Sequence, residues 1–268
     1  VISDVVDRDL CIGCGICVDF CSDNVLSMDW DRNGFLVPVQ KKQCLDDSNC
    51  IQVCPFNPIP HSNIRTEQEI AENFLEKDLK FHPKIGKFSS LYAGYSIEHR
   101  LTSSSGGIAT YILTKLLKNK VVDKIITVKN KENSKFLYEY SICNTIEEVH
   151  QSAKTRYYPV TLAQTIEKIR MKEEKFAIVG VACFIKAIRL AQNKEPELSS
   201  KIPFLVGIIC GGVKSKFYTE YLASKAGASK GNIINPDSRL KNLYQNDTDY
   251  PFKCSDSKKH LYSVDMKK

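Results

Sequence analysis

Residues 11–21 read CIGCGICVDFC, and residues 44–54 repeat the same spacing as CLDDSNCIQVC. The first stretch places four cysteines at C-x2-C-x2-C-x3-C, and in the second stretch Asp47 stands where the second cysteine is expected. A gap of two residues lets neighbouring thiolates reach different irons of one cube while the backbone wraps around it. Zinc sites usually take two separated pairs of ligands, so the duplicated array predicts iron–sulfur clusters rather than zinc.

The spacing is typical of two-cluster bacterial ferredoxins, in which the last cysteine of each array ligates the cluster of the other array. We therefore expect one [4Fe–4S] cluster to be held by Cys11, Cys14, Cys17 and Cys54. The second cluster is expected to take Cys21, Cys44 and Cys50, with Asp47 at its fourth position. Two alternatives stay open there: Asp47 ligates an iron, or the site holds a [3Fe–4S] cluster.

The other cysteines are not arranged like a disulfide framework. Seven of the 11 cysteines belong to the two arrays, and the remaining four are scattered between residues 143 and 254. Secreted disulfide-rich domains are short and dense in cysteine, unlike this chain of 268 residues. Oxygen-labile clusters and free thiols predict a reducing, cytoplasmic location, typical of an anaerobe. The chain begins without Met and ends in a polar tail, which suggests a fragment.

Charge is distributed unevenly along the chain. Residues 1–60 carry nine acidic and four basic side chains, a net charge of −5, whereas residues 61–268 carry +12. A basic remainder suits an anionic cofactor or an acidic protein partner. The lysines are dispersed and form no recognisable nucleic-acid-binding module, so we expect no nucleic-acid partner. No signal peptide is evident, and no apolar run approaches the roughly 18 residues of a membrane span.

The pattern of apolar residues predicts two kinds of domain. Two short apolar stretches around a turn at Asn33-Gly34 predict a hairpin between the cysteine arrays. From about residue 88 strands alternate with helices of 10–15 residues, which indicates an α/β domain. We expect strands at 91–98, 124–129, 136–143, 175–180 and 203–210, and helices at 70–80, 108–119, 161–174, 182–192 and 215–227. The run 204–209 is interpreted as a buried strand.

The predicted fold is therefore an α+β two-cluster ferredoxin-like domain followed by an α/β domain with a mostly parallel sheet. The expected segments are the ferredoxin-type domain over 1–60, a linker with a short helix over 61–87, the α/β domain over 88–229, and the start of a C-terminal region, interpreted as truncated, over 230–268. Residues 230–268 are polar and turn-rich, and their pattern predicts no definite elements.

Three predicted strand-to-helix junctions are rich in glycine or cysteine, and they read SSSGG (103–107), GVAC (180–183) and CGG (210–212). In open α/β sheets ligands collect where strands end and helices begin, and helix N-termini favour anions. Each loop alone is a weak signal, because such a glycine often serves only a turn and such a serine only caps a helix. Neither GxGxxG nor GxxxxGK[ST] is present, which excludes a standard Rossmann or P-loop motif.

The segment KTRYYP (154–159) concentrates charged and aromatic side chains. Lys154 and Arg156 can clamp a phosphate or carboxylate, and Tyr157 can stack on a flavin ring. The alternative is a solvated basic loop with one packed tyrosine. Cys183 and Cys210 are interpreted as small core residues, with a redox role as the alternative. The five histidines have no metal-site spacing, and no hydrolytic triad is recognisable.

The order of these segments resembles the family of coenzyme F420 hydrogenase/dehydrogenase beta subunits. The resemblance rests on the cysteine arrays followed by RLTSSSGGIATYILTKLL, HQSAKTRYYPV, FAIVGVACFIKAIRLA and PFLVGIICGGVKSKFYTEYL, and it covers nearly all of residues 5–225. It implies that the α/β domain binds FAD and exchanges electrons with the clusters and with the deazaflavin coenzyme F420.

The resemblance also implies the cofactor contacts. The positions that coincide with the family's flavin-binding segments are Ser104, Ser105, Gly106, Gly107, Lys154, Arg156, Tyr157, Gly180 and Cys183. Cys210 and Gly211 coincide with a later Cys/Gly turn. Ala182 replaces the family's proline in its G-x-P-C turn, and Asp47 replaces a cysteine, so both positions depart from the family pattern.

The expected function is a flavin- and iron–sulfur-dependent electron-transfer oxidoreductase, because clusters move single electrons whereas hydride chemistry moves two. Expected partners are redox proteins or other oxidoreductase subunits, together with F420 or another organic acceptor. Two rival functions remain: a noncatalytic electron-relay subunit, and an F420-independent FAD reductase linked to glycan metabolism. No side chain is predicted to act as an acid or a base.

Overall fold

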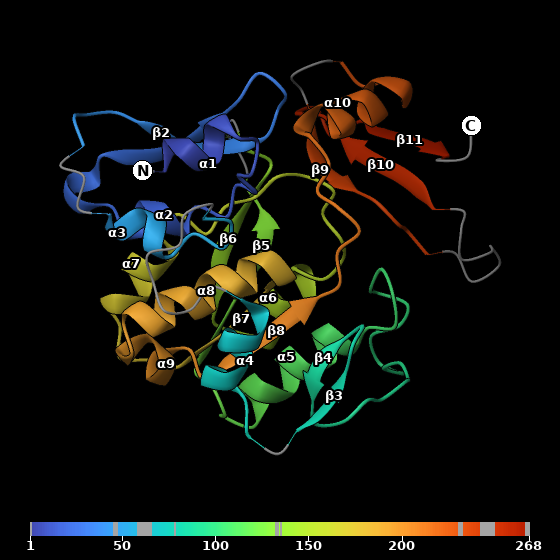
Figure 1. Cartoon of the computed structure of the whole chain (residues 1–268). Coiled ribbons are helices and arrows are strands. Elements are labelled where there is room, and N and C mark those ends of the chain that lie inside the picture. Colours follow the sequence, from blue (N-terminus) through green and yellow to red (C-terminus); the bar gives the residue numbers. More distant parts are fainter. Residues whose placement is uncertain are drawn as a thin grey trace.

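The structure, a computed structural model, describes residues 2–44, 48–57, 66–77, 79–131, 134, 136–229, 233–241 and 250–265. Asp47, the unusual member of the second array, lies outside the described residues. The described part contains a small N-terminal module, a central sheet covered by helices on both faces, and a C-terminal antiparallel sheet (Figure 1).

The N-terminal module is a hairpin surrounded by short helices. Its elements are α1 (Ser3–Asp7), α2 (Ile16–Asp19), η1 (Ser22–Asn24), β1 (Leu26–Trp30), β2 (Leu36–Gln40) and α3 (Asn49–Gln52). Strands β1 and β2 pair antiparallel around the predicted turn, with Trp30 opposite Leu36. The α2 and α3 helices both begin inside a cysteine array, and Cys17 and Cys50 pack with Val5 and Leu26 in one buried cluster. The cysteine arrays and the core of this module are therefore the same structure.

The central sheet is mixed. Its strands are β5 (Lys124–Asn130), β6 (Tyr138–Cys143), β7 (Phe176–Val181) and β8 (Phe204–Ile208), and their order in the described residues is β6-β5-β7-β8. The β5–β7 and β7–β8 pairs are parallel, and β5–β6 is antiparallel. The predicted α/β architecture is thus confirmed in its coarse form, with one antiparallel pairing at the edge.

Helices cover both faces of this sheet because the buried strands are apolar on both sides. The helices are α5 (Ile108–Lys118), α6 (Ile146–Gln151), α7 (Thr165–Arg170), α8 (Ala182–Lys194) and α9 (Glu197–Lys201). Ile125 and Val179 face α5 and α6 in one core cluster, whereas Ile126 and Ile178 face α7 and α8 in the other. The hydrophobic cluster that contains Ile126 and Ile178 also includes Cys14 of the N-terminal module, so the two parts share a hydrophobic core.

Two predictions about individual strands are wrong. Residues 91–98 contain no strand, and Tyr92 and Ile97 of this segment are exposed. The run 204–209 was predicted to be buried, but β8 is the outer described strand of the sheet, and Phe204, Ile208 and Ile209 are 40%, 44% and 99% exposed. An apolar run indicates a strand but does not tell whether a second layer covers it.

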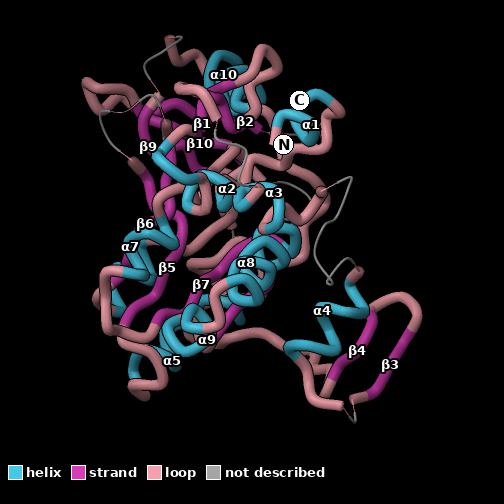
Figure 2. Tube along the Cα trace, turned by 60° about the vertical axis from the view of Figure 1, so that its left-hand side comes forward, coloured by secondary structure: helices cyan, strands magenta, loops and turns pink. Residues whose placement is uncertain are grey.

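Two peripheral units complete the fold. The linker region forms α4 (Glu67–Phe74), which packs on α8 through Ile70 and Leu190, and a hairpin of β3 (Lys80–His82) and β4 (Gly86–Phe88), which projects at the lower right of Figure 2. The C-terminal region, for which the sequence predicted no elements, forms β9 (Ile234–Asp237), β10 (Pro251–Ser255) and β11 (Leu261–Asp265) in the order β11-β10-β9. The helix α10 (Lys216–Lys225) packs on this sheet through Leu222 and Phe252.

Candidate functional site

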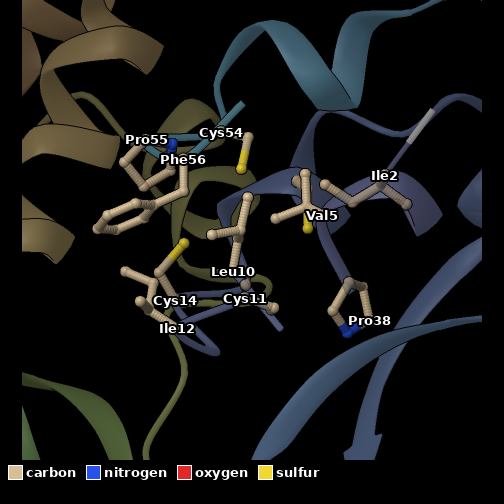
Figure 3. A pocket seen from close by; sticks show the side chains of 12 residues that line it. Ile2, Val5, Leu10, Cys11, Ile12, Cys14, Pro38, Cys54, Pro55 and Phe56 are labelled. Carbon is tan, nitrogen blue, oxygen red and sulfur yellow. The ribbon is translucent and has the colours of Figure 1, made fainter. Parts of the chain in front are cut away.

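A pocket in the N-terminal module brings together all four cysteines predicted to hold the first cluster. The space between its lining atoms amounts to about 340 Å³, which includes the part that is open to solvent. Its cysteine lining is Cys11, Cys14, Cys17 and Cys54, which come from the first array and from the end of the second array. Figure 3 shows the thiols of Cys14 and Cys54 pointing toward each other across the pocket. Leu10, Pro55 and Phe56 supply part of an apolar wall around the sulfurs.

The raised pKa values of these thiols are consistent with a bound group that contains positively charged metal ions. Burial raises the pKa of Cys14 and of Cys17 far above the usual value, and it raises the pKa of Cys54 to about 11. Their mutual repulsion as thiolates raises each pKa further. Four thiolates in one pocket, two of them buried and two half-buried, therefore need nearby positive charge, which irons supply. Among the described residues no group of three His, Cys, Asp or Glu side chains is placed to hold a single metal ion.

The second predicted ligand set is only partly described. Cys50 belongs to the same hydrophobic core cluster as Cys17, and Cys21 packs against that cluster. Cys44 is half-buried at the end of a described segment. Because Asp47 lies outside the described residues, its role as a ligand stays a prediction.

The first pocket is docked directly onto the central domain. The carbonyl oxygen of Cys14 accepts a hydrogen bond from the backbone N–H of Leu162 at 2.8 Å and another from the Thr161 hydroxyl at 3.3 Å. Gly15 has a φ of 77°, and a Cβ atom there would lie 2.0 Å from Thr161 Oγ1. Only glycine fits both this backbone conformation and this close contact.

Asp19 forms a second link between the two parts. Its carboxylate accepts from the backbone N–H groups of Gln164 and Ile166 at the start of α7, the latter at 2.7 Å. Arg170 donates to the Asp19 carbonyl oxygen at 2.8 Å. Burial raises the pKa of Asp19 to about 6, although these N–H groups and Arg170 oppose the shift. Sequence reasoning missed this link, because it joins residues about 145 positions apart and has no local pattern.

The predicted SSGG loop and the predicted KTRYYP segment lie side by side. The hydroxyl of buried Ser104 accepts a 2.8 Å hydrogen bond from the backbone N–H of Thr155. Ser105 is exposed, and its carbonyl oxygen accepts from Lys241. The carbonyl oxygen of Gly106 accepts from the backbone N–H of Ser96, and Gly107 immediately precedes α5. Two loops that are about 50 residues apart in the sequence are thus in direct contact.

Lys154 and Arg156 both face a carboxylate that sequence reasoning missed. Lys154 Nζ lies 3.1 Å from Asp237 Oδ2, and Arg156 Nη1 lies 4.0 Å from Asp237 Oδ1. Within the described residues, buried Arg156 Nε and Asp237 Oδ1 have no hydrogen-bond partner. Lys154 has a backbone φ of 93°. This conformation is unfavourable for any residue other than glycine, and such strained residues recur at functional sites. Asp237 lies on β9, in the region where the sequence predicted no elements.

Aromatic rings connect this segment to the N-terminal module. Tyr158 lies edge-on to Trp30 of β1, with ring centroids 5.6 Å apart, and at the same distance from Tyr138 of β6. Arg156 lies over the Tyr138 ring at 5.3 Å. Tyr157, the predicted flavin-stacking residue, is half-buried, and its carbonyl oxygen accepts from Thr219 of α10.

Gly180 and Cys183 form a second group at the carboxyl end of β7. The Tyr140 hydroxyl lies 3.2 Å from the position of a Cβ atom on Gly180. Val181 of β7 pairs with Ile208 of β8 in parallel register. Cys183 comes two residues after Val181 and Cys210 two residues after Ile208, so both cysteines follow the same end of neighbouring strands. Burial raises the pKa of Cys183, and the Cys210 thiolate raises it further. Cys183 also packs against the core cluster that contains Cys14.

No helix among the described residues is both long and apolar enough to cross a membrane.

Comparison with known proteins identifies three segments. Residues 10–57 match the profile of a 4Fe-4S dicluster domain. Residues 91–167 match the N-terminal part, and residues 173–261 the C-terminal part, of the coenzyme F420 hydrogenase/dehydrogenase beta subunit.

Two curated proteins are similar over most of the chain. The coenzyme F420-dependent sulfite reductase of Methanocaldococcus jannaschii is 27% identical over 78% of this chain and 32% of its own length. One of the subunits of the F(420)H(2) dehydrogenase of Methanosarcina mazei is 22% identical over 78% of this chain and 55% of its own length. The chain thus spans between about a third and about half of these relatives.

A solved structure is similar over a smaller part. A chain of the F420-reducing [NiFe] hydrogenase complex from Methanosarcina barkeri is 20% identical, with a TM-score of 0.46 over 65% of this chain and 59% of that chain. The two beta-subunit profiles together cover more than half of the sequence, in the predicted order and after the dicluster domain. The chain belongs to the family of coenzyme F420 hydrogenase/dehydrogenase beta subunits.

Proposed function

We propose that this chain is an electron-transfer oxidoreductase that passes electrons between two iron–sulfur clusters, FAD and coenzyme F420. The observation that carries the proposal is the contact between the four-cysteine pocket and residues 161–162, which directly continue the segment that holds Lys154, Arg156 and Tyr157. Electron transfer needs the donor and acceptor sites close together, and this contact joins the two candidate sites through the short backbone segment from Tyr157 to Leu162 and its hydrogen bond to Cys14.

The residues would hold the cofactors in distinct ways. When bound, the clusters supply one-electron chemistry and FAD supplies both one- and two-electron chemistry. The first cluster is proposed to be a [4Fe–4S] cube on the four pocket cysteines. Ser104, Lys154 and Arg156 are proposed to hold the anionic part of FAD, because they combine a buried hydroxyl with two cations on adjacent loops. Tyr157 is proposed to contact the flavin ring.

The charge of the chain supports an anionic organic substrate. Residues 61–268 carry a net charge of +12, and F420 bears carboxylates and a phosphate, which such a field attracts. The curated relatives are described as an F420-dependent reductase and an F(420)H(2) dehydrogenase, and we extend that substrate to this chain. One relative is part of a multisubunit enzyme, so we also propose further oxidoreductase subunits as partners in a reducing, cytoplasmic setting.

The test is anaerobic F420 reduction by the chain after reconstitution with iron, sulfide and FAD, with a reduced viologen as donor. Turnover that depends on FAD supports the proposal. A preparation with verified clusters that retains no flavin contradicts the FAD assignment and favours an electron-relay role. A preparation with verified clusters and flavin but without turnover contradicts the F420 assignment and leaves another organic acceptor.

The Lys154→Ala variant provides the matched comparison. Lys154 would contact the cofactor's anionic group and no cluster, so K154A should lose FAD while it keeps the iron content of the unaltered chain. Loss of iron together with FAD would contradict this separation of roles.

A further inference from the structure

The segment 236–241, here called the C-terminal strap, reaches from the C-terminal sheet to both loops of the proposed cofactor site. It begins on β9, where the Asp237 carboxylate lies 3.1 Å from Lys154 Nζ in the KTRYYP segment. At its other end the ammonium group of half-buried Lys241 donates to the carbonyl oxygen of Ser105 in the SSGG loop. One short segment therefore contacts two loops that are about 50 residues apart in the sequence.

Lys241 makes two hydrogen bonds to this region rather than one. Its Nζ atom also donates to the carbonyl oxygen of Arg100 at 2.6 Å, so a single ammonium group joins positions 100 and 105. An ammonium group has three donors, and hydrogen bonds to a charged group contribute more than hydrogen bonds between neutral groups. The two carbonyl oxygens repel each other, so without Lys241 nothing would hold them at one point.

The backbone fixes the two ends of this loop but not its middle. The backbone N–H of Ser96 donates to the carbonyl oxygen of Gly106 at 2.8 Å, and the N–H of Arg100 donates to that of Ser96 at 2.9 Å. Within the described residues, the backbone groups of residues 101–105 form no hydrogen bond with another backbone group. The shape of this stretch therefore depends on contacts with side chains.

Ser104, a proposed cofactor contact, lies in that stretch. Its hydroxyl accepts a 2.8 Å hydrogen bond from the Thr155 N–H, so the hydroxyl proton remains available to a ligand. The α5 helix begins directly after the loop without a side-chain cap, so the first N–H groups of α5 can also face an anion. The carbonyl group that Lys241 holds belongs to Ser105, the next residue in the chain. The place of the Ser104 hydroxyl is therefore coupled to Lys241.

We propose that Lys241 is a positioning residue of the cofactor site, and that its ammonium group holds the SSGG loop in the shape that binds FAD without contacting FAD. The inference rests on the FAD assignment of the proposed function. It extends the site to the C-terminal region, where the sequence predicted no elements. The C-terminal strap then serves both loops, through Asp237 at one end and Lys241 at the other.

The experiment measures the affinity of the reconstituted full chain for FAD by the quenching of flavin fluorescence. Lys241→Met keeps an unbranched side chain and removes the ammonium group, whereas Lys241→Arg keeps the charge and the donors. Lys258→Met is the matched control, because Lys258 is an exposed lysine in the turn between β10 and β11 of the same C-terminal region. We expect K241M to raise the dissociation constant of FAD about tenfold, K241R to stay within about threefold of the unaltered chain, and K258M to change nothing.

A double-mutant cycle with Ser104→Ala separates positioning from direct contact. If Lys241 acts through the loop that carries Ser104, K241M should weaken FAD binding much less in the S104A background than in the unaltered chain. Additive losses would overturn the proposal, and so would an unchanged affinity in K241M or an equal loss in K258M. The iron content should be that of the unaltered chain in every variant. Loss of iron together with FAD in K241M would indicate general unfolding and would also overturn the local role of Lys241.

Hydrogen exchange of the flavin-free chain tests the same role without the cofactor. The amides of residues 101–107 should exchange faster in K241M than in the unaltered chain, because the loop loses two hydrogen bonds, and their exchange should be unchanged in K258M. Unchanged exchange in K241M would contradict this inference alone. An unaltered chain with verified clusters that retains no flavin would instead contradict the proposed function, so the two failures are distinguishable.

Discussion

The backbone N–H of Leu162 donates a 2.8 Å hydrogen bond to the carbonyl oxygen of Cys14, a predicted ligand of the first cluster. The bond crosses between two parts of the chain that the sequence suggested were separate domains. Asp19 and Thr161 reinforce the same contact, and Cys14 itself is part of the central core. The N-terminal module is therefore a fixed part of the fold, and the orientation of the first pocket is set by the central domain.

Gly15→Ala should disrupt this contact. The alanine Cβ would clash with Thr161 Oγ1 and would sit on a backbone with a φ of 77°. We expect a loss of about 2–4 kcal/mol in the free energy of unfolding, from strain and overpacking together. Urea unfolding of the reconstituted chain measures it. Gly86→Ala is the control, because Gly86 has a similar φ of 76° but nothing within 4 Å. Equal losses in the two variants would show that the contact contributes nothing.

Glu148 should contribute to stability in a pH-dependent way. A hydrogen bond from Lys129 at 2.9 Å, followed by one from the backbone N–H of Asn144, lowers the pKa of Glu148 to about 2. A carboxyl whose folded pKa is depressed stabilises the fold above its unfolded pKa of about 4.3, and this stability is lost as the pH falls toward the folded value. Because the pair is partly exposed, its contribution is about 1 kcal/mol.

Glu148→Gln should therefore lower the melting temperature of the cluster-free chain at pH 7, and the difference from the unaltered chain should shrink as the pH falls from about 4.3 toward about 2. Circular dichroism at a series of pH values measures it. Glu173→Gln is the control, since the Glu173 side chain is fully exposed. A difference that stays constant with pH would contradict the ion-pair explanation and leave only the helix-capping role of Glu148.

The sequence predicted the features that depend on local spacing. The cysteine arrays, the hairpin at Asn33-Gly34 and the helices α5, α8 and α10 all have periodic or ligand-type signals, and they appear where expected. The four cysteines of the first pocket were predicted as a set, because the exchange of the last cysteine between arrays is a regular property of the spacing.

The features that the sequence did not predict depend on distant partners. Asp237 reaches Lys154 across 83 residues, and the Leu162–Cys14 bond joins positions 148 residues apart. No local pattern encodes such pairs. The exposure of Ile209 could not be predicted either, because an apolar strand has the same sequence whether or not a second layer covers it.

Cys14→Ser should remove the first cluster and leave the second. The oxygen ligand is harder than sulfur and binds the cube poorly, so we expect the iron content of the reconstituted chain to fall by about half. Iron and acid-labile sulfide analysis measures it. Cys143→Ala is the control, because Cys143 is buried in the other core cluster, outside both arrays. An iron content that falls equally in both variants would contradict the ligand assignment, and stoichiometric zinc without sulfide would contradict the cluster itself.

Asp237→Asn should strengthen the binding of FAD. In the structure the Asp237 carboxylate neutralises part of the charge of Lys154 and Arg156, the two cations proposed to hold the anionic part of FAD. Asparagine keeps the shape of the side chain and removes its charge. At the effective dielectric of a partly buried site one such charge is worth at least about 1 kcal/mol, so we expect the dissociation constant of FAD to fall about tenfold. Quenching of flavin fluorescence measures it.

Riboflavin is the control ligand in this experiment, because it has the same ring system as FAD but no phosphate. It therefore shows whether the change in affinity depends on the phosphate charge. Its affinity should be the same in D237N and in the unaltered chain. Asp265→Asn, which removes an exposed charge from β11 of the same C-terminal sheet, should change neither affinity. Weaker FAD binding in D237N would show that Asp237 positions the two cations rather than competing for them. Equal changes in the affinity for FAD and for riboflavin would contradict the proposal that Lys154 and Arg156 bind the anionic group of the cofactor.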